Sequence, residues 1–169
     1  MTAVSNAGPL IHLARIGRLG LLKELFDEVV APERVWEEVV ERGREKGAPD
    51  ALLIAEAGWV RVVEDPAGVG EIAERAGIHR GEASAILLAR SLRVPVLLDD
   101  AGARRFAQGL GLTVVGSVGV LIRAVRVGLL TVDEGLRDLE NLAEVTWLSV
   151  SVYEGARRAI ERMRERVRS

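Results

Sequence analysis

The sequence predicts an α/β fold in which a parallel sheet is flanked by helices. Short β-branched or apolar runs alternate with amphipathic stretches along the chain, which is the pattern of such a sheet. The chain has 169 residues, enough for one domain with a sizeable core. Neither an internal repeat nor a linker-like segment interrupts the alternation, so we expect a single domain over residues 1–169.

Strands and helices are expected to follow one another as far as the fifth strand. The apolar runs predict about five strands, namely Ala3–Ser5, Glu28–Val30, Val60–Val63, Val96–Leu98 and Thr113–Val115. Between them, apolar positions recur at helical spacing. The expected helices are Pro9–Ile16, Leu19–Phe26, Glu33–Arg44, Asp50–Ala57, Gly81–Ser91 and Ala101–Gly109. We expect the connection Glu64–Gly70 to be a mobile loop.

Helices alone are expected after the fifth strand. Val118–Val127 and Asp133–Leu142 have helical patterns, and Thr131 is placed to cap the second of them. Val152–Arg168 predicts a final amphipathic helix. We therefore expect residues 131–169 to form a C-terminal helical extension that packs on the domain.

Composition excludes several classes of protein. The chain has no cysteine, which rules out thiolate chemistry and fits a reducing compartment, so we expect a cytoplasmic protein. Its apolar runs fall short of the roughly 18 residues that cross a bilayer, so no membrane association is expected. The formal net charge of -2 is not that of a generally basic nucleic-acid binder, and any contact with nucleic acid must be local.

Polar side chains follow two of the expected strands. Asp99 and Asp100 come directly after Val96–Leu98, and Asn6 follows Ala3–Ser5. Open α/β sheets bind ligands in crevices at the carboxyl ends of their strands. Asn6 and Asp99 become neighbours if the first and fourth strands are adjacent, an order that the sequence alone does not determine.

Two glutamates on helices are candidates for the same crevice. Glu38 borders the apolar face of Val35 and Val39, and Glu82 opens a helix whose small residues permit a close approach to the sheet. Carboxylates at about 4 Å repel by around 4 kcal/mol at an effective dielectric near 20, so a cluster needs a cation, an arginine or a proton. Oxygen ligands alone suit Mg²⁺ or Mn²⁺, which can activate water for phosphodiester hydrolysis.

Each of these acids also has a simpler interpretation. A lone glutamate on a helix is usually a solvated side chain, which applies to Glu38 and Glu82. For Asp100, the simpler role is to cap the next helix and nothing more. For Asn6, it is to form a turn. These alternatives remain open at this point.

Four further polar residues are weighed beside the acids. Of Arg104 and Arg105, we expect one to form an ion pair and the other to be exposed. Arg104 and Ser117 are candidates for substrate binding, although an N-cap is the simpler role for Ser117. His12 has no recognisable partner in the sequence and is expected to be structural.

Five short motifs, in this order, resemble the PIN-domain family over Val4 to about Leu130. They are Val4-Ser5-Asn6-Ala7-Gly8-Pro9-Leu10-Ile11, Ala31-Pro32 with Val35-Trp36-Glu37-Glu38-Val39, Arg80-Gly81-Glu82-Ala83-Ser84-Ala85-Ile86, Leu97-Leu98-Asp99-Asp100 with Arg104-Arg105, and Gly116-Ser117-Val118-Gly119. The resemblance implies a three-layer α/β/α sandwich in which the first and fourth strands are adjacent. It also implies an Mg²⁺- or Mn²⁺-dependent nuclease, usually acting on RNA.

The family's site acids fall on Asn6, Glu38, Glu82, and Asp99 or Asp100. Many members are toxins of VapC-type toxin–antitoxin pairs, so the resemblance also implies a homodimer and an antitoxin partner. Asn6 departs from the usual first aspartate, which removes one charge and puts activity in doubt; Asp100 could compensate in part.

Three functions follow from these residues. The first is a metal-dependent ribonuclease that uses Glu38, Glu82, Asp99 and Asp100 as ligands, with Asn6 as a neutral one. The second is a catalytically degenerate module of the same fold that binds RNA or a partner protein. The third, a flavodoxin-like binder of a small molecule or nucleotide, has little motif support.

Overall fold

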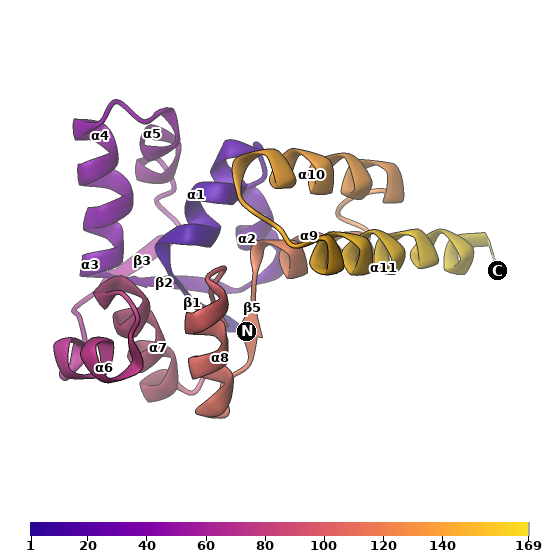
Figure 1. Ribbon diagram of the computed structural model, residues 1–169. Helices are drawn as coiled ribbons and strands as arrows, with labels where there is room; N and C mark the ends of the chain where they lie inside the picture. Colours follow the sequence, from indigo (N-terminus) through magenta and orange to yellow (C-terminus); the bar gives the residue numbers. More distant parts are fainter. Residues whose placement is uncertain (169) are drawn as a thin grey trace.

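A five-stranded parallel sheet forms the centre of the computed structural model, which describes residues 1–168 (Figure 1). The strands are β1 (Thr2–Ser5), β2 (Glu28–Pro32), β3 (Val60–Val63), β4 (Val96–Leu97) and β5 (Val114–Val115). They lie in the order β3-β2-β1-β4-β5, so the expected adjacency of the first and fourth strands is confirmed. Ser169, the last residue of the expected extension, lies outside the described range.

Helices cover both faces of this sheet. They are α1 (Ala7–Arg15), α2 (Gly20–Leu25), α3 (Glu33–Trp36), η1 (Glu37–Arg42), α4 (Gly43–Glu45), α5 (Pro49–Ala55), α6 (Val69–Ala76), α7 (Arg80–Leu92), α8 (Ala101–Gly109), α9 (Ser117–Arg126), α10 (Val132–Val145) and α11 (Val150–Arg168). In Figure 1, α6, α7 and α8 lie below the sheet, and α1, α2, α9, α10 and α11 lie above it. The three-layer α/β/α prediction is therefore correct.

Alternation along the strands creates the two cores between these layers. Ala3 and Leu97 belong to the core shared with α1, α2, α9, α10 and α11. Val4 and Val96, their neighbours in the chain, belong to the core shared with α7 and α8. Because successive strand side chains point to opposite faces, one short apolar run supplies both cores.

Two helical segments differ from the prediction. The expected single helix Glu33–Arg44 contains a π-helical stretch, η1, between α3 and α4. Such wider turns recur at functional sites, and this one includes Glu38. The helix α6 was not predicted; glycines with positive φ bound it at both ends, Gly68 (φ 85°) and Gly77 (φ 67°). Its apolar residues Val69, Ile72, Ala73 and Ala76 do recur at helical spacing, but the helix is short and lies between glycines, which are more typical of a loop.

The connection before α6 is fastened to two helices. Asp65 accepts a hydrogen bond from the backbone N–H of Arg34 at 3.1 Å and another from the Ser84 hydroxyl at 2.9 Å. The region expected to be a mobile loop therefore has an anchor at Asp65.

The C-terminal helices pack against α9. Thr131 caps α10 in a capping box with Glu134, as predicted for Thr131. Buried Asp138 of α10 accepts a hydrogen bond from Arg18 Nε at 2.6 Å. Leu142 and Ile160 lie fully buried in the same core as the sheet. Among the described helices, none combines the length and apolarity needed to span a membrane.

Candidate active site

A pocket of about 990 Å³ opens at the carboxyl ends of β1 and β4. The chain leaves β1 toward β2 on one side and returns through β4 on the other, so this is the switch point of the sheet, where open α/β folds bind ligands. Every residue proposed for the site from the sequence lines this pocket: Asn6, Glu38, Glu82, Asp99, Asp100, Arg104 and Ser117.

Asp99 forms a hydrogen-bonded half of the pocket with His12 and Ser117. The backbone N–H of Ser117 donates to Oδ1 at 2.7 Å, and the Ser117 hydroxyl donates to Oδ2 at 2.6 Å. His12 Nδ1 lies 2.6 Å from the same Oδ2. Because an ionised carboxylate only accepts hydrogen bonds, Nδ1 carries the proton in this pair.

The pKa of Asp99 lies below its usual range. Burial raises it, but the hydrogen bonds from the His12 ring and from the hydroxyl and backbone of Ser117 together lower it further. Asp99 is therefore a carboxylate with a fixed orientation.

One expectation for this half was wrong. Ser117 is not an N-cap, since Gly116 occupies that position and Ser117 is the first residue of α9. His12, expected to be structural, has a partner that the sequence did not indicate, because it contacts Asp99 from α1. Helical spacing could have indicated this contact, because Gly8 and His12 lie on the same face of α1. A Cβ on Gly8 would lie 3.5 Å from the Cβ of Asp99, so this face is close to Asp99.

Asp100 and Arg104 have mainly local partners. Asp100 is the N-cap of α8, and its Oδ2 accepts a hydrogen bond from the Ala103 N–H at 2.9 Å. Arg104 Nη1 donates a hydrogen bond to the Leu98 carbonyl at 2.9 Å. The ion pair expected for one of the two neighbouring arginines is not formed by Arg104 with any described residue. Arg105 is exposed, as one of the two arginines was expected to be.

Asn6, Glu38 and Glu82 form the opposite half, which lacks such partners. Asn6 is 8% exposed and Glu82 is 6% exposed. Asn6 Oδ1 and Glu82 Oε2 are buried without a hydrogen bond from any described residue. A Cβ added to Gly81 would lie 3.0 Å from Glu38 Oε2 and 3.6 Å from Asn6 Oδ1, so glycine leaves room for both oxygens. We call Asn6, Glu38 and Glu82 the unpaired half.

The pKa of Glu82 is raised. Burial is the largest cause, and the nearby carboxylates of Asp100 and Glu38 add to it, while His79 opposes it. The buried oxygens of Asn6 and Glu82, the second on a carboxyl group that resists ionisation, need a hydrogen-bond donor, a proton or a cation.

These residues fit a hydrated Mg²⁺ or Mn²⁺ better than a fully protein-bound ion. Among residues 1–168, no three His, Cys, Asp or Glu side chains converge closely enough to hold a metal by themselves. Mg²⁺ retains several waters and commonly uses one or two carboxylates. Glu38, Glu82 and the Asn6 amide oxygen offer that kind of partial, oxygen-only set.

The fold and pocket together define an α/β domain with an acidic site at its switch point. A family model described as a PIN domain, DUF3368, matches residues 2–162. The chain therefore belongs to this family of PIN domains, which are generally nucleases.

One solved structure shows that the fold is shared by a distant protein. The crystal structure of PAE2754 from Pyrobaculum aerophilum aligns with a TM-score of 0.55 at 14% identity, covering 75% of this chain and 96% of that one. The likeness supports the fold alone. No curated protein matches the sequence.

Proposed function

We propose that the protein is an Mg²⁺- or Mn²⁺-dependent ribonuclease that hydrolyses phosphodiester bonds in RNA. The observation that carries the proposal is the pair of buried, unpartnered oxygens, Asn6 Oδ1 and Glu82 Oε2, beside Glu38. A nuclease of the PIN family needs a cation where negative phosphate meets negative side chains. This half of the pocket has the oxygens to hold one.

The pocket residues have distinct roles in this proposal. Glu38, Glu82 and Asn6 would hold the ion, with Asp100 close to Glu82 and Asp99 in the hydrogen-bonded half of the pocket. When bound, the ion would supply charge neutralisation at the phosphate and lower the pKa of water. Asp99, fixed by His12 and Ser117, would orient the attacking water.

Arg104 lines the same pocket and keeps further N–H groups beyond the one that donates to the Leu98 carbonyl. Those groups can donate to a phosphate oxygen. As the toxin of a pair, such an enzyme would be a cytoplasmic homodimer held inactive by an antitoxin that covers this pocket.

A second function has its own support. Asn6 brings no charge, and Asp99 is already engaged by three hydrogen bonds. A site with these properties suits a catalytically degenerate PIN module that binds RNA or a partner protein without cleaving it.

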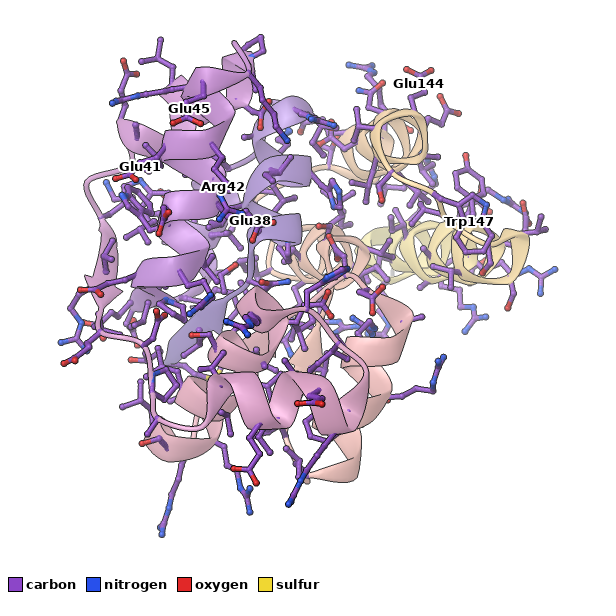
Figure 2. The ribbon with its side chains drawn as sticks, turned by 60° about the vertical axis from the view of Figure 1, so that its left-hand side comes forward. Glu38, Glu41, Arg42, Glu45, Glu144 and Trp147 are labelled. Carbon is purple, nitrogen blue, oxygen red and sulfur yellow. The ribbon has the colours of Figure 1, made fainter. Side chains whose placement is uncertain are left out.

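Two glutamates on one helix allow a matched test. Figure 2 shows Glu38 on the side of η1 that faces α1 and Glu41 on the other side; Glu41 is exposed and does not line the pocket. We expect the parent to cleave single-stranded RNA in the presence of Mn²⁺. The rate of cleavage should fall about a hundredfold in Glu38→Gln and in Glu82→Gln, and it should not change in Glu41→Gln.

The counter-outcomes are equally specific. Cleavage that persists in chelator and in Asp99→Asn contradicts the ribonuclease proposal. Cleavage that appears only in Asn6→Asp favours the degenerate module, since that change restores the usual charge.

A further inference from the structure

The pocket continues beyond the acidic residues to the connection between α10 and α11. Arg123 of α9, Trp147 of the connection and Val152 of α11 line this far end. Glu38 and Trp147 both line this pocket, and Figure 2 shows them well apart in the molecule. The pocket thus has an acidic end and an aromatic end.

Trp147 is far more exposed than a tryptophan with only a structural role. Its exposed fraction is 84%, whereas Trp36 and Trp59 are partly buried against the core. Val150 at 80% and Val152 at 47% are exposed beside it. An exposed apolar cluster at the rim of a pocket indicates a binding surface.

Arg123 supplies a positive charge at the same end. Its side chain is half-buried in the pocket wall, and no described residue forms an ion pair or side-chain hydrogen bond with it. A guanidinium held in this way is suited to a phosphate group.

We propose that this end of the pocket binds single-stranded RNA, with a base stacked on Trp147 and a backbone phosphate paired with Arg123. The inference rests on the proposed function, since it concerns how the substrate reaches the acidic end. Aromatic faces accept any unpaired base, and single-stranded nucleic acids are bound by such stacking combined with nearby cations.

The charge of the chain requires that any RNA site be a local one. With a formal net charge of -2, the protein has little general attraction for a polyanion. Affinity for RNA then has to come from a local site that combines stacking with one or two cations. Thr146, Ser149 and Ser151 separate the apolar side chains, which suits a nucleotide better than the continuous apolar face of a partner helix.

Binding can be measured without cleavage. A short fluorescein-labelled single-stranded RNA of mixed sequence is titrated in EDTA, and anisotropy gives the affinity. We expect Trp147→Ala to bind roughly tenfold or more weakly and Trp147→Phe to restore most of the loss. Val127→Ala is the matched control, because Val127 is 63% exposed and lies outside the pocket.

Two further readouts separate stacking from charge. RNA should quench the tryptophan fluorescence of the parent but not of Trp147→Ala. Arg123→Gln should lower the slope of log affinity against log salt by about 0.7, the value for one phosphate of a single strand. Trp147→Ala should leave that slope unchanged.

Several results would overturn the inference: no binding by the parent, equal binding by Trp147→Ala, or equal competition by duplex RNA. The inference would also be overturned if Trp147→Ala bound RNA as well as the parent but no longer self-associated. That result would identify the Trp147 surface as a protein interface. RNA binding through Trp147 without any Mn²⁺-dependent cleavage would leave this inference standing and refute the ribonuclease. Cleavage that is indifferent to Trp147 would do the reverse.

Discussion

The two halves of one pocket treat their acidic residues in opposite ways. Asp99 accepts three hydrogen bonds from His12 and Ser117, and its pKa is lowered. Glu82 keeps a buried oxygen without a donor, and its pKa is raised. Both carboxyl groups line the same cavity, so burial alone does not decide the charge of either.

The difference shows where a ligand has most to gain. Asp99 has already exchanged water for protein donors, so its position is fixed before any ligand arrives. Glu82 and Asn6 each have a buried oxygen without a donor among the described residues, and a cation with its own water shell can satisfy both. In the proposed enzyme, the paired half would therefore fix the geometry of the site, and the unpaired half would provide the affinity for the ion.

The largest effect is expected from removing the paired carboxylate. Asp99→Ala leaves the buried N–H and hydroxyl of Ser117 and the ring of His12 without their acceptor, so we expect a loss of about 3 kcal/mol in the free energy of unfolding. Asp100→Ala removes only the cap of α8 and should cost about 1 kcal/mol. Urea unfolding of both variants measures the contrast; equal losses would show that the Asp99 hydrogen bonds are not structural.

Two glycines provide a smaller test of the same contrast. A Cβ on Gly116 would lie 2.7 Å from Arg104 Nη1, 3.0 Å from Asp99 Oδ1 and 3.3 Å from the Leu98 carbonyl oxygen, all held by hydrogen bonds. A Cβ on Gly81 would meet only the flexible end of Glu38 closer than 3.4 Å.

We therefore expect Gly116→Ala to lower the free energy of unfolding by about 2 kcal/mol. Gly81→Ala should leave it within about 0.5 kcal/mol of the parent, because helix propensity offsets the displacement of Glu38. Thermal unfolding of the two variants measures this difference in stability. A Gly81→Ala protein as unstable as Gly116→Ala would mean that the unpaired half is as rigid as the paired one.

The fold was largely predictable because it depends on local patterns. Strand positions follow from short apolar runs such as Val96–Leu98, which feed two cores at once. The order of the strands was not local information and came only from the resemblance. The helix α6 escaped prediction because it is short and lies between glycines, which are more typical of a loop. The π-helical stretch η1 has only six residues and leaves no clear period of its own.

The members of the site were predictable, but their electrostatic states were not. Asn6 and Asp99 follow strands, Glu82 opens a helix, and Glu38 borders the apolar face of one, which sequence spacing can indicate. Whether a carboxylate finds donors depends on tertiary neighbours such as His12, which lies 87 residues from Asp99 along the chain. No pattern in the sequence distinguishes the paired Asp99 from the unpaired Glu82.

The smallest effect, and the most specific, concerns pH in the absence of divalent cations. The pKa of Glu82 is raised in the folded state, so its contribution to stability is present below the unfolded pKa near 4.5 and is lost as pH rises through the folded value. Glu82→Gln should therefore match the parent in acid and exceed it by on the order of 1 kcal/mol at neutral pH.

Asp99 has the opposite sign. Its pKa is lowered, so its contribution is present above the unfolded value near 3.8 and is lost as pH falls through the folded one. The free energies of unfolding of the parent, Glu82→Gln and Asp99→Asn, measured against pH in EDTA, should thus diverge in opposite directions. Parallel curves for the two variants would show that the halves of the pocket do not differ in charge state. Adding Mn²⁺ should then stabilise the parent more than Glu82→Gln, because a ligand stabilises only the state that binds it.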